Sequence, residues 1–238
     1  MVRVRIVLTR SSTRSGRLEA GLAEAGFDVA HLPLTEQVLP EETGPLTTAL
    51  LRLGAGEFQW LLLTSGNTVR FLLDAGWGGT VPAGTRIGVV GPGTAHTLAE
   101  LTGITERWMP QDHSADGILT EFAQTPEAAA LFLPQAARAQ PQLAEGLRSR
   151  GWDVTQAAAY DTVPVDGDLP WTPGPDDVVL LTASSAAKEW HRRGLTAGTV
   201  LAIGEPTART LRDLRAPADA VLPEPTAAGV LAALNPRN

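Results

Sequence analysis

IGVVGPGTAHTL, residues 87–98, is the stretch from which the fold can be predicted. It starts as a short apolar run, turns at glycine and continues with a hydroxyl residue, as a buried parallel strand followed by a helix does. The pattern recurs as VLAIGEPTARTL, residues 200–211, in which Gly204 stands 113 residues after Gly91 (204 − 91). The first turn of such a helix presents unpaired N–H groups and the positive end of a dipole, and it can therefore bind an anion. The sequence predicts two related α/β lobes that both offer such turns.

Other parts of the chain repeat as well, but in a different order. Leu62–Ser65 matches Leu180–Ala183 at an offset of 118 (180 − 62), whereas Gly26 matches Gly151 at an offset of 125 (151 − 26). Insertion of one lobe into the other explains this permuted order. We therefore predict an α/β protein with two flavodoxin-like parallel-sheet lobes, the second inserted in the first and joined to it by a two-segment linker. The predicted bounds are 1–34 and 176–238 for the discontinuous lobe, 45–158 for the inserted lobe, and 35–44 and 159–175 for the linkers.

Three local elements are predicted from periodicity and turn residues. Ser12–Ala25 has the pattern of an amphipathic helix that stops at Gly26. Arg107–Met109 is predicted to be a short strand, and Asp153–Ala158 a further strand.

The composition excludes several classes of protein. The 238-residue chain has 19 basic and 26 acidic residues, hence a formal net charge of −7, whereas a nucleic-acid-binding protein needs a basic surface. It has no cysteine, which rules out disulfides and thiolate chemistry. No apolar run approaches the roughly 18 residues of a membrane span, and the N-terminal stretch lacks the apolar region of a signal peptide. We expect a cytoplasmic protein with no nucleic-acid or membrane partner, and a monomer, because no large apolar surface stretch is evident.

Hydroxyl residues follow four predicted strands, at Ser65, Thr94, Ser184 and Thr207. A hydroxyl in such a turn can bind an anion together with neighbouring N–H groups, or it can simply cap its own helix. Both alternatives stay open for any one residue, and the repetition in two lobes favours binding. Nucleotide binding is not supported, because His96 stands where a dinucleotide fingerprint needs its third glycine.

Basic side chains near the predicted strand ends could bind an acidic ligand. The guanidinium group is a planar fork of donors that matches a carboxylate, so Arg10, which follows the first strand, is a candidate binding residue. Four further arginines have comparable positions, namely Arg14, Arg70, Arg138 and Arg209. The alternative for each of them is a solvated surface arginine.

Tyr160 is the only tyrosine, and it lies where the chain leaves the predicted inserted lobe. A phenol carries its proton at neutral pH and can donate it. The alternative is a packing residue whose hydroxyl meets water. The four histidines lack the spacing of metal ligands, so we expect no metal site and interpret each histidine as a surface or cap residue.

A series of short motifs runs along nearly the whole chain: Val7–Arg10, Leu32–Leu34, Trp60–Val69, Val90–Ala95, Ala159–Thr162, Val179–Ala186, Ile203–Ala208 and Pro225–Leu231. In order and spacing this series resembles the uroporphyrinogen-III synthase family. Each motif is weak alone, but the series and the permuted repeat are together quite specific.

The resemblance implies an enzyme without a cofactor that closes a linear hydroxymethylbilane to uroporphyrinogen III, inverts the last pyrrole ring and releases water. It also implies a tetrapyrrole substrate with an acetate and a propionate on every ring, and an upstream deaminase that makes the bilane as a partner. Tyr160 matches the family tyrosine proposed to help the hydroxyl group leave as water. The predicted substrate-binding set is Arg10, Ser65, Gly91, Thr94, Ser184, Gly204 and Thr207.

Two positions depart from the family pattern. Glu205 brings a negative charge into the last repeated turn, and Gln135 and Ala136 stand where many members have Arg-Gly. Two alternatives to an active synthase remain, namely a non-catalytic two-lobe binding protein and an inactive relative of the family. Only the synthase would convert its ligand.

Overall fold

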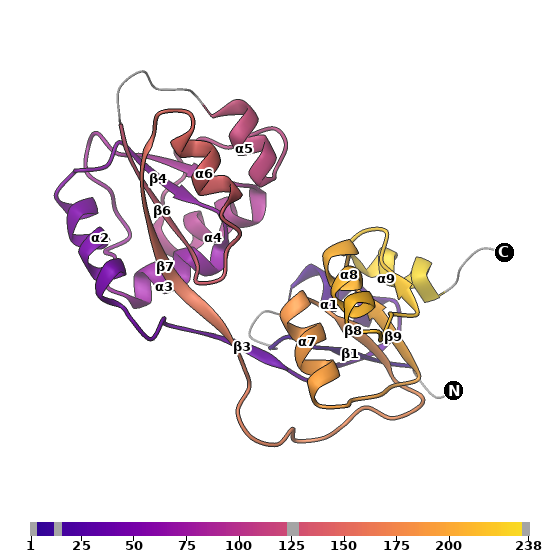
Figure 1. Ribbon diagram of the computed structural model, residues 1–238. Coiled ribbons are helices and arrows are strands. Elements are labelled where there is room, and N and C mark those ends of the chain that lie inside the picture. The colour runs from indigo at the N-terminus through magenta and orange to yellow at the C-terminus, as the bar shows by residue number, and fades with distance from the viewer. Residues whose placement is uncertain (1–3, 12–15, 123–128, 235–238) are drawn as a thin grey trace. The chain divides into compact units, whose positions relative to one another are not determined.

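The chain forms two compact units in the computed structural model, which describes residues 4–11, 16–122 and 129–234. Unit 1 comprises Met1–Glu36 and Thr162–Asn238, and unit 2 comprises Gln37–Asp161. Each unit contains a five-stranded sheet with helices on both faces (Figure 1). Unit 1 is therefore discontinuous in sequence, and unit 2 is continuous.

The elements of unit 1 are β1 (Arg5–Leu8), α1 (Arg17–Glu24), β2 (Asp28–His31), β8 (Val178–Leu181), α7 (Ser184–Arg192), β9 (Thr199–Ala202), α8 (Glu205–Asp213), β10 (Ala220–Val221) and α9 (Ala227–Leu234). Those of unit 2 are α2 (Gly44–Gly54), β4 (Trp60–Leu63), α3 (Gly66–Asp74), β5 (Arg86–Val89), α4 (Pro92–Thr102), α5 (Ala115–Glu121), β6 (Ala130–Ala136) and α6 (Gln142–Arg148). Two more strands, β3 (Thr35–Val38) and β7 (Asp153–Pro164), cross the boundary between the units.

The sheet of unit 1 confirms the flavodoxin-like prediction. Its strand order is β10-β9-β8-β1-β2, and all four pairings are parallel. Numbered along unit 1 alone, this order is the 2-1-3-4-5 of the flavodoxin-like fold, written from the other edge. The sheet of unit 2 has the order β3-β7-β6-β4-β5, and its β7-β6, β6-β4 and β4-β5 pairings are parallel.

The permuted repeat in the sequence corresponds to a repeat in the sheets. The sequence matches relate β4, β5, β6 and β7 to β8, β9, β1 and β2, and these strands follow the same order in their two sheets. The fifth strand differs, because β10 lies beyond β9 in unit 1 whereas β3 lies beyond β7 in unit 2. The segment of unit 2 that corresponds to β10 differs from the prediction. Arg107–Met109 does not form a strand: its pairing with β5 is limited to a single isolated bridge between Trp108 and Gly88.

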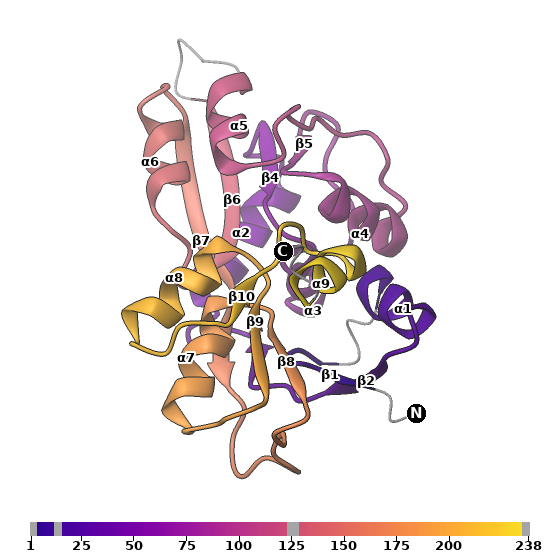
Figure 2. The same ribbon diagram turned by 90° about the vertical axis from the view of Figure 1, so that its right-hand side faces the viewer.

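The core of each unit lies in two layers, one on either face of the sheet. Trp60–Leu63 and Val178–Leu181 are buried throughout, as expected for central parallel strands covered on both sides. In unit 1, α7 and α8 pack on one face and α1 and α9 on the other (Figure 2). In unit 2, α2, α3 and α4 pack on one face and α5 and α6 on the other.

The predicted linkers contain strands. β3 lies within the predicted linker 35–44, and β7 continues six residues beyond Ala158 to Pro164. Both linker segments are extended because β3 and β7 are neighbours in the sheet of unit 2. The predicted helix Ser12–Ala25 is α1 from Arg17 onward, while residues 12–15, with Arg14, lie outside the described residues. None of the described helices is long and apolar enough to span a membrane.

Two buried carboxylates with arginine partners predict that unit 1 loses stability in acid. Arg5 binds both carboxylate oxygens of Asp177 at 2.8 and 2.6 Å, and these hydrogen bonds lower the pKa of Asp177. Hydrogen bonds from Arg192 and Arg193 likewise lower the pKa of Glu189. A carboxyl group whose pKa is lowered in the folded state takes up a proton more readily after unfolding. Its contribution to the free energy of unfolding is therefore complete above the unfolded pKa of about 4 and is lost as pH falls through the folded pKa. We expect the free energy of unfolding of unit 1 to fall from about pH 5 downward.

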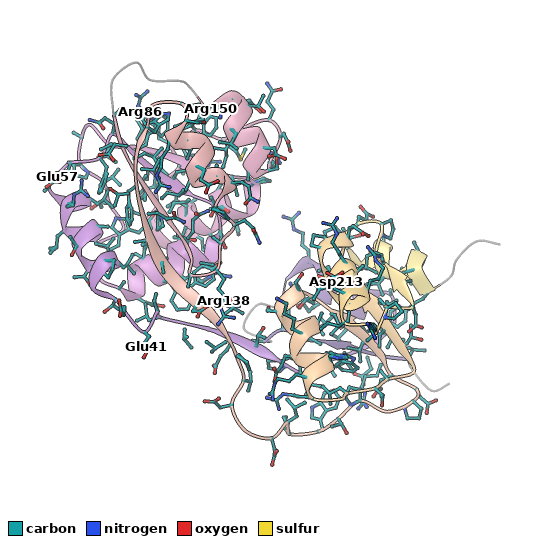
Figure 3. All side chains as sticks on the ribbon, in the orientation of Figure 1. Glu41, Glu57, Arg86, Arg138, Arg150 and Asp213 are labelled. Carbon is teal, nitrogen blue, oxygen red and sulfur yellow. The ribbon has the colours of Figure 1, made fainter. Side chains whose placement is uncertain are left out.

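Glu189→Gln tests this expectation by urea unfolding. The variant should lose about 2 kcal/mol at pH 7, as is usual for a lost hydrogen bond to a charged group, and its stability should depend less on acid. Glu57→Gln is the matched control, because the Arg52–Glu57 pair is exposed (Figure 3). Parallel pH curves for Glu189→Gln and the wild type would contradict the assignment.

Candidate active site

The predicted site residues of unit 1 lie at the carboxyl ends of its parallel strands. Arg10 follows β1, Ser184 follows β8, and Gly204 and Thr207 follow β9. Because β1, β8 and β9 are adjacent and parallel, the structure brings these four residues to one edge of sheet 1. This edge is where open α/β sheets bind their ligands.

The predicted site residues of unit 2 gather in the same way. Ser65 follows β4, Gly91 and Thr94 follow β5, and Tyr160 lies in β7 opposite Ala136, the last residue of β6. The strand order β7-β6-β4-β5 places the phenol at one end of this row and the glycine turn at the other. Each unit thus presents four of the eight candidates at one sheet edge.

The hydroxyl residues have different local roles. Ser65 is the N-cap of α3, and its Oγ accepts the Asn67 N–H at 3.1 Å. Thr94 and Thr207 are the third residues of α4 and α8, are 6% and 3% exposed, and have hydroxyls without a partner in the described part of the chain. Ser184 is the first residue of α7 and donates from Oγ to the Pro206 carbonyl at 3.1 Å. Ser65 is therefore an N-cap whose hydroxyl proton is still available to a ligand, and the other three residues are not N-caps. Anion binding by these hydroxyls stays a prediction.

The two glycines that begin the repeated turns are not equivalent. Gly91 and Gly204 are the N-caps of α4 and α8, with φ of −169° and −178°, an extended conformation that any residue adopts. A Cβ at Gly91 would lie 3.1 Å from Cβ of His113, whereas at Gly204 the nearest atom is Cδ of Pro206 at 3.9 Å. His113, which we predicted to be a surface or cap residue, thus packs with its Cβ against the start of α4.

The guanidinium of Arg10 is already engaged. It donates to Oε1 of Glu19 from Nε at 2.9 Å and from Nη2 at 2.6 Å. Glu19 is 8% exposed, and its second oxygen accepts the Gly16 N–H at 2.9 Å. A ligand carboxylate at Arg10 would have to use its remaining donors, so binding there stays a prediction.

The two departures from the family pattern also have partners within the protein. Glu205, the first residue of α8, pairs with Arg212 two turns along the same helix, which compensates its charge. Gln135 is 6% exposed and accepts a hydrogen bond from Gln156 at 3.2 Å. Gln135 is thus part of the β6-β7 pair.

A β-bulge decides which way Tyr160 points. Gln135 pairs with Ala158, but the next residue, Ala136, pairs with Tyr160, so β7 has one extra residue at this point. Successive strand residues point to opposite faces, and an extra residue reverses the order. Ala157 and Ala159 belong to the core cluster beneath α2, α3 and α4, and the bulge places Tyr160 in that same cluster. The sequence contains no signal for this bulge.

The phenol ring is held by an aromatic neighbour. Tyr160 is 8% exposed and stacks on Phe71 of α3, with ring centroids 5.3 Å apart and an angle of 22° between the planes. Its hydroxyl has no hydrogen-bond partner among the described residues. The phenol can therefore donate to a ligand without breaking an internal hydrogen bond.

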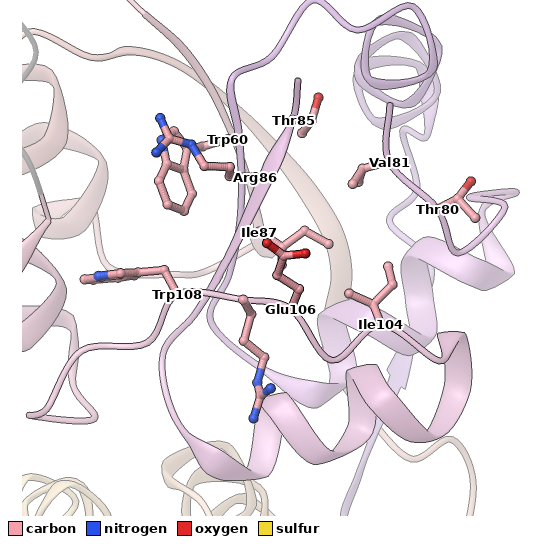
Figure 4. A pocket seen from close by; sticks show the side chains of 10 residues that line it. Trp60, Thr80, Val81, Thr85, Arg86, Ile87, Ile104, Glu106 and Trp108 are labelled. Carbon is pink, nitrogen blue, oxygen red and sulfur yellow. The ribbon is translucent and has the colours of Figure 1, made fainter. Parts of the chain in front are cut away.

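A pocket of about 660 Å³ lies at the other end of the strands in unit 2 (Figure 4). Trp60 and Arg86, the first residues of β4 and β5, line it together with Trp108 and Glu106. It borders the amino end of β5, next to the single bridge at Trp108. This pocket is separate from the candidate site, which lies at the carboxyl ends.

No cluster of three or more possible metal ligands occurs within residues 4–11, 16–122 and 129–234. The candidate groups at the two sheet edges are helix N-termini, hydroxyls, one arginine and one phenol, which are groups that can bind and protonate an anionic organic molecule.

The fold and these groups define a class: a two-unit flavodoxin-like α/β protein whose strand ends are equipped for an anionic ligand. The family model for uroporphyrinogen-III synthase HemD matches residues 16–232. The chain belongs to that family.

Individual relatives agree with the family match. The chain is 28% identical over 194 residues to the chloroplastic uroporphyrinogen-III synthase of Oryza sativa subsp. japonica, a match that covers 78% of this chain and 63% of the relative. It is 28% identical over 166 residues to the porphyrin biosynthesis protein HemD of Ruminiclostridium josui, covering 66% of this chain and 32% of that protein. The chain thus spans less than two thirds of either curated relative.

Solved structures show the same fold. Uroporphyrinogen-III synthetase from Helicobacter pylori 26695 superposes with a TM-score of 0.63 at 20% identity, covering 97% of both chains. A mutant uroporphyrinogen III synthase from the extremely thermophilic bacterium Thermus thermophilus gives 0.59 at 20% identity, covering 98% of this chain and 99% of that one. At this identity the likeness supports the architecture alone.

Proposed function

We propose that this protein is an active uroporphyrinogen-III synthase, which cyclises linear hydroxymethylbilane with inversion of the last ring and loss of water. The observation that carries the proposal is Tyr160, a phenol with a free hydroxyl that lies, in a chain of this family, at the same sheet edge as Ser65 and Thr94. Neither alternative, a binding protein or an inactive relative, is favoured by the family match.

The proposed reaction needs one proton donor and much positioning. Tyr160 donates its proton to the hydroxymethyl oxygen as the C–O bond breaks, so that water leaves and the carbon becomes electrophilic. The substituted carbon of the terminal ring then attacks this carbon, and the bond from the substituted carbon to its original methylene bridge breaks. That methylene re-bonds to the unsubstituted α-carbon of the same ring, which inverts the ring, and the proton lost from that α-carbon returns to the phenolate. In the family that this chain resembles, hydroxymethylbilane also cyclises without enzyme and then gives the uninverted isomer. The main task of the enzyme is therefore to hold the substrate in the conformation that leads to inversion.

The remaining candidates bind the polycarboxylate. Carboxylates on the rings meet first-turn N–H groups, those of α3 and α4 in unit 2 and those of α7 and α8 in unit 1. Ser65, Thr94 and Thr207 donate from their hydroxyls, whereas Ser184 would have to release its hydrogen bond to the Pro206 carbonyl in order to donate. The backbone at Gly91 and Gly204 contributes N–H groups free of side-chain bulk. A cytoplasmic location, a monomeric state and supply of the bilane by a deaminase remain predictions of the sequence.

The decisive experiment supplies hydroxymethylbilane, made in place by a deaminase, to the purified protein. The product is then oxidised and the uroporphyrin isomers are separated. Predominantly isomer III, formed faster than spontaneous closure, supports the synthase. Only isomer I from folded protein would eliminate it and favour the binding protein or the inactive relative.

Phe71→Leu is expected to lower kcat about tenfold with a smaller change in KM. The stacked ring contributes about 0.5–1.5 kcal/mol to the aromatic pair, and without it the phenol loses its fixed direction. Phe58→Leu is the matched control, because Phe58 stacks on Phe132 at 5.4 Å in the same core cluster. Equal kcat values for the two variants would show that stacking does not position Tyr160.

A further inference from the structure

Arg138 lies beside the strand that carries Tyr160. It is in the turn directly after β6, where Ala139 N–H donates to the Ala136 carbonyl at 3.0 Å. The preceding residue, Ala137, donates its N–H to the Tyr160 carbonyl at 2.8 Å. The backbone on both sides of Arg138 is therefore fixed relative to the phenol.

The side chain of Arg138, by contrast, has donors to spare. It is 79% exposed, and its ion-pair partner among the described residues is Asp161, with Nε and Oδ1 3.6 Å apart. At that distance the two charged groups form an ion pair, but the separation is too long for a hydrogen bond. Arg10 and Arg193 differ, because both donate at 2.5–2.9 Å to a buried carboxylate. The donors of Arg138 are thus unused within the described part of the chain.

The pairing with Asp161 also orients the guanidinium. Asp161 directly follows Tyr160 in β7, and successive strand residues point to opposite faces. Arg138 therefore approaches the end of β6 from the face opposite the phenol. A ring placed at this strand end would meet Tyr160 on one side and the guanidinium on the other.

We propose that Arg138 binds a carboxylate of the pyrrole ring on which Tyr160 acts. This inference rests on the proposed function and specifies one ligand contact of that site. A guanidinium matches a carboxylate with two parallel N–H donors, and an incoming carboxylate would meet donors that Asp161 does not fill. Arg138 is then a substrate-binding residue that fixes the ring relative to the phenol.

The test compares Arg138→Gln, Arg138→Lys and Arg86→Gln. Arg86→Gln is the control because it also removes one positive charge. Arg86 is exposed at the start of β5, at the end of unit 2 opposite Arg138 (Figure 3). Binding of uroporphyrin III, a fluorescent octacarboxylate, is measured by titration at low and high salt. Steady-state kinetics with the bilane give KM and kcat separately.

We expect Arg138→Gln to weaken uroporphyrin binding and raise KM about tenfold, to reduce the salt dependence of binding, and to change kcat less. Arg138→Lys should recover part of the loss, and Arg86→Gln should match the wild type. Wild-type-like binding and salt dependence for Arg138→Gln, or an equal loss in Arg86→Gln, would overturn the inference. Failure of the wild-type protein to form isomer III would instead refute the proposed function, which the isomer assay detects separately.

Discussion

Tyr160→Phe is expected to lower kcat about 100-fold or more while KM stays close to the wild-type value. A positioned general acid typically accelerates proton transfer by about 10²–10⁴-fold, and this substitution removes the proton while keeping the ring. The ring packs on Phe71, so the stacking and the cavity around it are preserved. Because the lost hydroxyl has no internal partner among the described residues, no buried polar group is left unsatisfied.

The measurement is isomer-resolved turnover of hydroxymethylbilane, with the urea midpoint as a check on folding. Isomer I should become a larger share of the product, because spontaneous closure continues while the enzymatic reaction slows. Unchanged turnover in folded Tyr160→Phe would remove the tyrosine from the mechanism. The proton would then have to come from another group or from water.

Gly117→Ala is expected to destabilise unit 2 by about 3 kcal/mol, which is the upper range for overpacking a well-packed site. Gly117 is buried in α5, and a Cβ there would lie 1.9 Å from the Asp112 carbonyl oxygen. Backbone cannot move aside as a flexible side chain can. The turn before α5 is also held by hydrogen bonds, from Ser114 N–H to Asp112 at 2.7 Å and from Gly117 N–H to Ser114 Oγ at 3.0 Å.

Urea unfolding followed by tryptophan fluorescence measures this effect, because Trp60, Trp77, Trp108 and Trp152 all lie in unit 2. Gly93→Ala is the matched control. Gly93 is an exposed helical glycine with no atom within 4 Å of the added Cβ, so alanine should be neutral or stabilising by up to about 1 kcal/mol. Equal midpoints for the two variants would contradict the steric argument.

The destabilisation caused by Gly117→Ala should also disturb the candidate site at the start of α4. The turn broken by Gly117→Ala carries His113, whose Cβ packs against Gly91 at the start of α4. Unit 1 has the same construction, in which a Cβ at Gly229 would lie 2.0 Å from the Glu224 carbonyl oxygen. Pro225 stands there at the position of His113, so the turn itself does not require a histidine.

Local sequence determined the architecture of this protein. Short apolar runs such as Trp60–Leu63 are typical of central parallel strands, which are buried on both faces, and glycine with a hydroxyl residue then marks the helix start. These signals act over a few residues, and their permuted order already indicated an inserted lobe. They also placed Ser65, Thr94 and Gly204 at strand ends, which parallel pairing brings to common edges.

Tertiary structure alone decided how the site residues are used. The bulge opposite Ala136 turns Tyr160 onto Phe71, Glu19 occupies the guanidinium of Arg10, and the turn after β6 leaves donors of Arg138 unused. Each outcome depends on residues from different strands and helices meeting in three dimensions. A hydrogen bond or a register shift depends on distances of a few tenths of an ångström between such segments, and no local pattern of residues encodes them.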